Sequence, residues 1–219
     1  MILDNKVLAR IGGALYLLVA VGGAFAEFGA RGTVKVAGDA AATAANIAQH
    51  ATLFRAGLVA DLVDFVCFLA VGLVLYAMLR RVHPEVAVAM LVINAVSVAI
   101  QALNMLNHAG ALLVATDPRF ASLSSGALFF LELHHVGYLI AQIFFGLYLL
   151  PLGYLVYRSG MFPRALGIAL MVGSVGYVVG IVVTPLAMVG GIAELLFLVW
   201  LLVRGVSDKK PVRWATASA

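Results

Sequence analysis

The sequence is poor in cysteine and in charge. Cys67 is the only cysteine among 219 residues, and 11% of the residues are charged. One cysteine excludes an intramolecular disulfide framework and a CxxC redox motif. The low charge, together with 64% hydrophobic residues and a mean hydropathy of +1.09, excludes an ordinary soluble domain. A lipid bilayer is the solvent that fits this composition.

Long apolar runs dominate the chain instead. A helix rises about 1.5 Å per residue and needs about 20 apolar residues to cross the hydrocarbon core of a bilayer. The sequence therefore predicts an all-α, polytopic integral membrane protein that forms one helical-bundle domain over residues 1–219. Six transmembrane helices are predicted at residues 8–28, 56–79, 86–114, 127–157, 165–184 and 187–203, with an outer loop at 29–55.

Basic residues are distributed unevenly between the two sides of this predicted bundle. Ten lie on one side: Lys6, Arg10, Arg80, Arg81, Arg158, Arg164, Arg204, Lys209, Lys210 and Arg213. Four lie on the other: Arg31, Lys35, Arg55 and Arg119. The positive-inside rule then places both termini in the cytoplasm, N-in and C-in. Because these charges lie beside helix ends, the net charge of +4 predicts membrane lipids, and not nucleic acid, as partners.

Two local patterns add detail to the bundle. Asp39 precedes an alanine-rich stretch and is a suitable N-cap for a short helix in the outer loop. That helix would either cover the outer mouth of the bundle as a lid or serve only as a connection. Gly176 and Gly180 form a GxxxG step, which favours close packing of the fifth predicted helix.

Ionisable residues inside the predicted helices gather towards the outer side. An ionised group at the bilayer centre costs about 2.5 to 3.5 kcal/mol on insertion scales, so such residues usually face the bundle interior. On the third helix, polar side chains follow steps of three and four residues and share one stripe. This stripe consists of Asn94, Ser97, Gln101, Asn104 and His108. The eight ionisable residues are Glu27, Asp61, Asp64, His108, Glu132, His134, His135 and Glu194.

Two interpretations of this constellation stay open. The polar groups either pair with Arg31, Arg55 and the backbone to hold helices together, or they surround a functional pocket. The number of carboxylates favours a polar pocket in the outer half of the bundle. Its predicted border consists of Glu27, Arg55, Asp61, Asn104, His108, Glu132, His134 and Glu194.

Three functions are compatible with such a pocket. Histidines and carboxylates are ligands for a divalent metal such as Zn²⁺, which would activate water to hydrolyse a lipid-like substrate. In this hypothesis Glu132 and Asp61 are catalytic, His134 and His108 bind the metal, and Glu27, Arg55, Asn104 and Glu194 bind the ligand. No HExxH motif supports it. The alternatives are a proton-coupled transporter, with Asp61 or Glu132 carrying the proton, and a protein that binds a lipid or small amphipathic molecule without catalysis. Oligomerisation is possible in each case.

Several sequence blocks resemble one family of bacterial membrane proteins, domain of unknown function 4386. The blocks are Ala9 to Phe28, Leu53 to Leu69 around Asp61, Leu133 to Gly146 (LHHVGYLIAQIFFG), Leu149 to Ser159 (LLPLGYLVYRS) and Phe162 to Met171 (FPRALGIALM). The resemblance implies a multi-pass bundle in the bacterial cytoplasmic (inner) membrane and supplies no activity. It also implies that Glu27, Asp61, Glu132 and His134 occupy recurrent polar positions, whereas Asp64 and His135 are particular to this chain.

Overall fold

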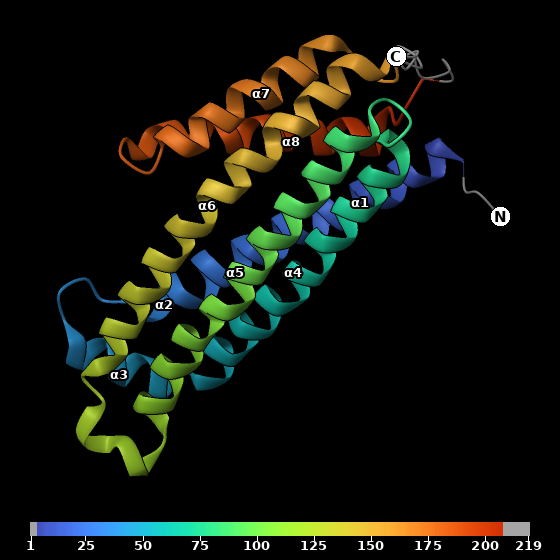
Figure 1. Cartoon of the computed structure of the whole chain (residues 1–219). Helices are drawn as coiled ribbons and strands as arrows, with labels where there is room; N and C mark the ends of the chain where they lie inside the picture. Colours follow the sequence, from blue (N-terminus) through green and yellow to red (C-terminus); the bar gives the residue numbers. More distant parts are fainter. Residues whose placement is uncertain (1–3, 208–219) are drawn as a thin grey trace. The chain divides into compact units, whose positions relative to one another are not determined.

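The computed structural model describes residues 4–207, and within that range it contains helices and no strands (Figure 1). The helices are α1 (Asn5–Ala24), the π-helix η1 (Phe25–Arg31), α2 (Gly32–Val34), α3 (Ala40–Gln49), α4 (Ala51–Leu79), α5 (Pro84–Thr116), the 3-10 helix η2 (Pro118–Leu123), α6 (Gly126–Ser159), α7 (Arg164–Val179), the 3-10 helix η3 (Thr184–Leu186) and α8 (Ala187–Val203). The all-α prediction is therefore confirmed. Lys209, Lys210 and Arg213, counted for the predicted orientation, lie outside the described residues.

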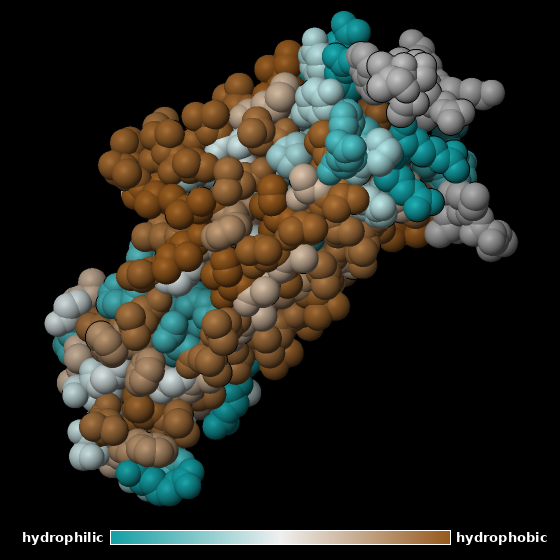
Figure 2. Space-filling view, viewed as in Figure 1, coloured by the Kyte–Doolittle hydropathy of each residue, from teal (hydrophilic) through white to brown (hydrophobic). Residues whose placement is uncertain are grey.

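Five helical segments in residues 4–207 are long and apolar enough to cross a membrane. They are Asn5–Val34, Ala51–Leu79, Pro84–Thr116, Gly126–Ser159 and Thr184–Val203. Helices suit this solvent because each satisfies its own backbone hydrogen bonds, and Figure 2 shows a face covered mostly by apolar side chains. The predicted span at 165–184 corresponds to α7, whose 16 residues extend about 24 Å, less than the hydrocarbon thickness of about 30 Å. The count of six spans stays a prediction.

The predicted outer loop at 29–55 is mostly helical. The first helical segment continues through η1 and α2 to Val34, and α4 begins at Ala51. The short helix predicted after Asp39 is confirmed as α3, because the Asp39 carboxylate accepts a hydrogen bond of 2.9 Å from the amide of Ala42. Buried apolar residues explain the longer helices, since Val34 and Phe54 are both fully buried.

The chain divides into two compact units. Unit 1 is formed by the described residues of Met1–Leu17, Phe68–Ser97 and Gln142–Ala219, and unit 2 by Leu18–Cys67 and Val98–Ala141. Helices α1, α4, α5 and α6 each contribute residues to both units. The single domain over residues 1–219 stays a prediction.

Unit 2 has an apolar core that includes α3. Its buried residues come from the helical elements α2, α3, α4, α5 and α6: Val34, Ala44, Ile47, Phe54, Ala111, Val114, Ala127 and Leu131. Ile47 on α3 is fully buried, so α3 contributes one apolar face to this core. Whether α3 also acts as a lid stays a prediction.

In unit 1, α7 and α8 pack side by side (Figure 1). Glycine permits this approach, because a Cβ on Gly176 would lie 2.7 Å from the carbonyl oxygen of Leu186 and one on Gly173 would lie 2.9 Å from the Cβ of Ala193. The close packing predicted from the GxxxG step is confirmed. Arg10 on α1 donates hydrogen bonds to the carbonyl oxygens of Leu202 and Val203 and so caps the end of α8.

Candidate functional site

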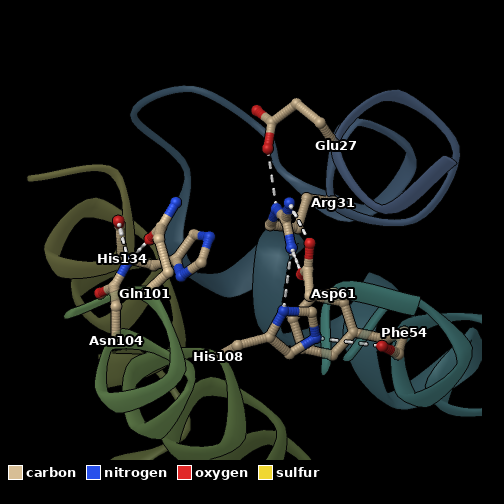
Figure 3. A network of polar contacts seen from close by, with 8 residues as sticks. All are labelled: Glu27, Arg31, Phe54, Asp61, Gln101, Asn104, His108 and His134. Carbon is tan, nitrogen blue, oxygen red and sulfur yellow. Dashed lines mark hydrogen bonds and ion pairs between the residues drawn. The ribbon is translucent and has the colours of Figure 1, made fainter. Parts of the chain in front are cut away.

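A buried arginine organises the polar residues of unit 2. The Arg31 side chain belongs to a membrane-spanning segment and is buried within the protein, with 10% of its surface exposed. Its guanidinium forms ion pairs with the carboxylate of Asp61 on α4 and, at 2.8 Å, with that of Glu27 (Figure 3). Asp61 is 8% exposed and Glu27 is 58% exposed. The Arg31 guanidinium therefore binds one buried carboxylate and one exposed carboxylate.

The arginine is presented by an unusual stretch of backbone. Glu27 and Arg31 both lie in η1, a π-helix of seven residues between α1 and α2. π-helical turns are rare and occur frequently at functional sites. The spacing of four residues lets the two side chains meet on the same side of this turn. The local geometry therefore marks the Arg31 cluster as a candidate site.

His108 on α5 completes the surroundings of Arg31. Its Nδ1 atom lies 3.3 Å from Nη1 of Arg31, and its Nε2 atom lies 3.0 Å from the carbonyl oxygen of Phe54. A guanidinium has only donors and a carbonyl only accepts, so Nδ1 is the acceptor and Nε2 carries the hydrogen. The ring also stacks on Phe54 with centroids 3.9 Å apart. His108 is thus a neutral imidazole with both nitrogens engaged.

Asn104 and His134 extend the cluster. The Asn104 amide donates a 2.9 Å hydrogen bond to the backbone carbonyl of His134, and the ring of His134 stands edge-on to that of His108 at 6.0 Å (Figure 3). His134 is 5% exposed, and among the described residues 4–207 its Nδ1 atom has no hydrogen-bond partner. The polar stripe predicted on α5 is buried along its whole length, from Asn94 to His108.

A second carboxylate of α4, that of Asp64, is also buried. It is 5% exposed and, within residues 4–207, forms no hydrogen bond or ion pair. Its carboxylate packs against the backbone of Gly22 and Gly23, where a side chain at Gly22 would collide with it. The glycine pair therefore makes the space that Asp64 occupies.

Unit 1 contains a different polar cluster, around Glu194 on α8. The two carboxylate oxygens of Glu194 accept hydrogen bonds from the hydroxyls of Tyr16 and Tyr177, the latter at 2.5 Å. Among residues 4–207 no Lys or Arg forms an ion pair with Glu194. Tyr148 packs against the same Phe68 ring as Tyr16, is fully buried, and has a hydroxyl without a hydrogen-bond partner within residues 4–207. We call these four residues the Glu194 cluster.

The structure brings together only some of the predicted site residues. Glu27, Asp61, His108, Asn104 and His134 gather in unit 2 (Figure 3). The other three do not join this group, for separate reasons.

Glu132 is 53% exposed and forms an ion pair of 2.9 Å with Lys35. Arg55 is exposed and forms no hydrogen bond or ion pair within the described part of the chain. Glu194 belongs to unit 1, where its partners are tyrosines. Helical spacing places a residue on a face, but the partner that a side chain finds depends on which helix lies opposite.

The metal hypothesis gains no support from this geometry. Residues 4–207 contain no group of three or more His, Cys, Asp or Glu side chains placed to hold a metal ion. The lone pair of His108 is taken by Arg31, so this imidazole has none left for a metal.

Two surface hollows lie away from these clusters. One, of about 310 Å³, is lined by Lys6, Arg10 and Arg204, and another, of about 330 Å³, by Met161, Trp200 and Arg204. Both belong to unit 1, and neither is lined by a predicted site residue. The outer polar pocket stays a prediction.

The predicted border of the pocket left out three residues that the structure places at the centre of these clusters. Arg31 had a signal, since its spacing of four residues from Glu27 indicated a pair, although not a buried one. Tyr16 and Tyr177 had none, because isolated tyrosines in apolar helices are common as packing or interfacial residues.

Long apolar helices that carry buried ionisable clusters define the class of this protein, a multi-pass integral membrane protein. The model of one family, described as "Domain of unknown function (DUF4386)", matches residues 11–205. The chain belongs to that family. This confirms the resemblance stated from the sequence.

One curated relative is also similar over a shorter stretch. It is a protein of Archaeoglobus fulgidus, described as "Uncharacterized protein", and is 37% identical over 76 residues. The match covers 30% of this chain and 44% of the relative, so the chain spans less than half the length of that protein. No solved structure matches.

Proposed function

We propose that this chain is a proton-coupled membrane carrier whose working site is the Arg31 cluster. The observation that carries the proposal is the ion pair between Arg31 and Asp61, which is buried in membrane-spanning helices and shared with Glu27. Ionisable residues in such segments are rare and mark proton relays and ion or substrate pathways. A pair that served only to join two helices would need one carboxylate for one cation.

The surplus of acceptors around Arg31 suggests how the site works. A proton on Asp61 would remove its charge and weaken its bond to the guanidinium. Arg31 would keep Glu27 and the Nδ1 atom of His108, both of which it already contacts. One edge of the guanidinium would then be free for an anionic group of the cargo. Proton binding at Asp61 and anion binding at Arg31 would thus occur together.

A carrier fits these residues better than metal-assisted hydrolysis does. Water activation needs about three protein ligands and an open coordination position. The imidazole lone pair of His108 accepts a hydrogen bond from Arg31, and the exposed carboxylate of Glu132 forms an ion pair with Lys35. The His134 nitrogen that lacks a partner is one ligand, which is too few.

Proton uptake into proteoliposomes tests the carrier. Purified protein would be reconstituted with a pH-sensitive dye inside, inorganic phosphate outside as the probe anion, and a potassium diffusion potential. We expect uptake with the wild type and uptake at the protein-free level with Asp61→Asn. The matched control is Glu132→Gln, an exposed carboxyl of the same unit, which should retain wild-type uptake.

Two results would contradict the carrier. The first is no uptake above protein-free vesicles with the wild type. The second is wild-type uptake with Asp61→Asn. Size-exclusion profiles and helical circular dichroism show whether a variant has a folding defect. If Asp61→Asn does not fold, Arg31→Lys supplies the deciding measurement. This variant keeps the positive charge but loses the fork geometry of the guanidinium, so reduced uptake is expected.

The orientation belongs to the same proposal. Both termini would face the cytoplasm of a bacterial cell, with α7 as a sixth, short span. In a Cys67→Ser background, Arg81→Cys and Arg119→Cys would each place a thiol at an exposed position outside the membrane-spanning segments. A membrane-impermeant maleimide added to intact cells should label the variant at Arg119 and spare the variant at Arg81. The reverse pattern would overturn the orientation.

A further inference from the structure

We propose that unit 1 holds a separate binding site, centred on Glu194, for a lipophilic organic ammonium ion. The site does not depend on the Arg31 cluster or on proton coupling. It is built from a carboxylate that lacks a cation, a group of aromatic rings, and a buried hydroxyl that lacks a hydrogen-bond partner. Each of these features is complementary to an organic ammonium ion.

The carboxylate is the first feature. Tyr16 donates to one oxygen of Glu194 and Tyr177 to the other, so both oxygens act as acceptors. An ionised carboxylate has about four lone-pair positions, and these two bonds leave the others open. Within residues 4–207 no basic side chain pairs with it. A partly buried carboxylate with this arrangement is complementary to a mobile cation.

Aromatic rings supply the second feature. Phe68 lies 6.0 Å from Tyr16, 5.5 Å from Phe145 and 5.5 Å from Tyr148, measured between ring centroids. One of these rings, that of Tyr16, carries the hydroxyl that donates a hydrogen bond to Glu194. The faces of aromatic rings attract cations, and the attraction is stronger where water is excluded. Aromatic rings packed beside a tyrosine that binds the carboxylate favour an organic cation over a hydrated metal ion.

The hydroxyl of Tyr148 distinguishes between classes of organic cation. It is fully buried and has no hydrogen-bond partner within residues 4–207, which is rare for a buried hydroxyl in native structures. Its oxygen is an acceptor for an N–H group. The preferred ligand is therefore a protonated amine that carries N–H donors, and not a quaternary ammonium ion.

The surroundings of Glu194 would let an amphipathic amine reach the carboxylate from the lipid. Glu194 is only partly buried, and the nearby α8 residues Ile192, Leu195 and Leu196 are apolar and more than half exposed. An amine with an apolar tail would leave its tail beside these residues and bring its ammonium group to the carboxylate. The neighbouring Gly191 keeps the space beside the Tyr177 hydroxyl free of a side chain.

Calorimetric titration of the full chain in lipid nanodiscs tests this site. The probe is phenylbutylammonium, with its trimethylammonium analogue and phenylbutyrate as references. We expect the wild type to bind the amine and not the carboxylate. Glu194→Gln should weaken amine binding about a hundredfold, because the charge pair is lost. Glu85→Gln, which removes an exposed carboxylate of the same unit, should bind as the wild type does.

Two further variants separate a ligand site from a packing role. Glu194→Asp keeps the charge and should bind more tightly than Glu194→Gln. Tyr148→Phe should weaken phenylbutylammonium about fivefold and leave the trimethylammonium analogue unchanged, since only the former has N–H donors. The proposal is overturned if the wild type does not bind the amine, if phenylbutyrate binds equally well, or if the Asp and Gln variants have equal affinities. None of these results bears on proton uptake through Asp61.

Discussion

In unit 2 a buried guanidinium compensates the carboxylate of Asp61, whereas in unit 1 the carboxylate of Glu194 is held by two tyrosine hydroxyls and has no cation beside it within residues 4–207. Both carboxylates lie in helices that suit a membrane interior. The first is stabilised by charge and the second by hydrogen bonding. The two clusters should therefore respond differently when one member is removed.

The difference lies in what remains after a substitution. Removing Asp61 leaves a buried cation with one partner fewer, which is a large electrostatic penalty. Removing a tyrosine hydroxyl leaves Glu194 with its other hydroxyl, which is a smaller loss. Because its charges compensate each other, the Arg31 cluster should tolerate the loss of a member poorly. The Glu194 carboxylate can exchange one hydrogen-bond donor for another, because it is held by hydroxyl groups.

The largest expected effect is at the buried ion pair. Asp61→Ala should lower the free energy of unfolding by about 3 kcal/mol, because Arg31 loses its buried counter-ion. The double variant Arg31→Met with Asp61→Leu should recover most of that loss, since no unpaired charge remains. Unfolding in mixed micelles measures both. If the double variant is as unstable as the single one, packing and not charge explains the effect.

The next effect is at the uncompensated carboxyl of unit 2. Gly22→Val should destabilise the protein by about 2 kcal/mol, because the new side chain collides with the buried Asp64 carboxylate. Adding Asp64→Ala should relieve much of this loss, which a double-mutant cycle measures. Gly126→Val is the control, since a Cβ there meets nothing within 4 Å. Additive effects of the two substitutions would contradict the predicted contact.

In unit 1 two tyrosines should behave oppositely. Tyr177→Phe should lower the free energy of unfolding by about 1 kcal/mol, because Glu194 loses a hydrogen bond. Tyr148→Phe should leave stability unchanged or raise it, because its hydroxyl has no hydrogen-bond partner in the described part of the chain. Thermal unfolding of the two variants side by side checks this. Equal losses in both would show that the Tyr148 hydroxyl is satisfied in the folded protein.

The smallest effect concerns an exposed ion pair outside the spans. Arg119 donates hydrogen bonds to Asp117 and holds the pKa of that carboxyl below its usual value. The folded-state pKa is lowered, so this pair stabilises the protein above the ordinary Asp pKa of about 3.9 and loses that effect as the pH falls through the lowered value. Arg119→Gln should raise the pKa of Asp117, as carboxyl NMR would show. The stability change should be far smaller than at Asp61, because both groups are solvated.

Much of the fold was predictable from local pattern. The apolar runs identified every long helix, Asp39 identified α3, and the GxxxG step identified the close packing of α7. These features depend on neighbours in sequence. Helix ends were less predictable, because α4 begins five residues earlier than its apolar run, where Phe54 is buried in the core of unit 2.

The candidate site was predictable as a set of polar residues and not as a set of contacts. Glu27, Asp61, His108, Asn104 and His134 do gather, as their positions in the helices suggested. The central cation, Arg31, was assigned a supporting role, since its burial depends on helices from three separate parts of the chain. Nothing in the sequence distinguishes an arginine at a helix end from one turned inward.

The sequence by itself determined the solvent, because a chain so apolar and so poor in charge can bury its surface only in lipid. It also determined where helices form, because in lipid each backbone must satisfy its own hydrogen bonds. The tertiary structure alone decided which polar groups meet. Arg31 finds Asp61 and His108 across two other helices, and Glu194 finds tyrosines instead of the histidines expected beside it. Such pairings depend on helix packing, which brings residues together from positions far apart in the chain.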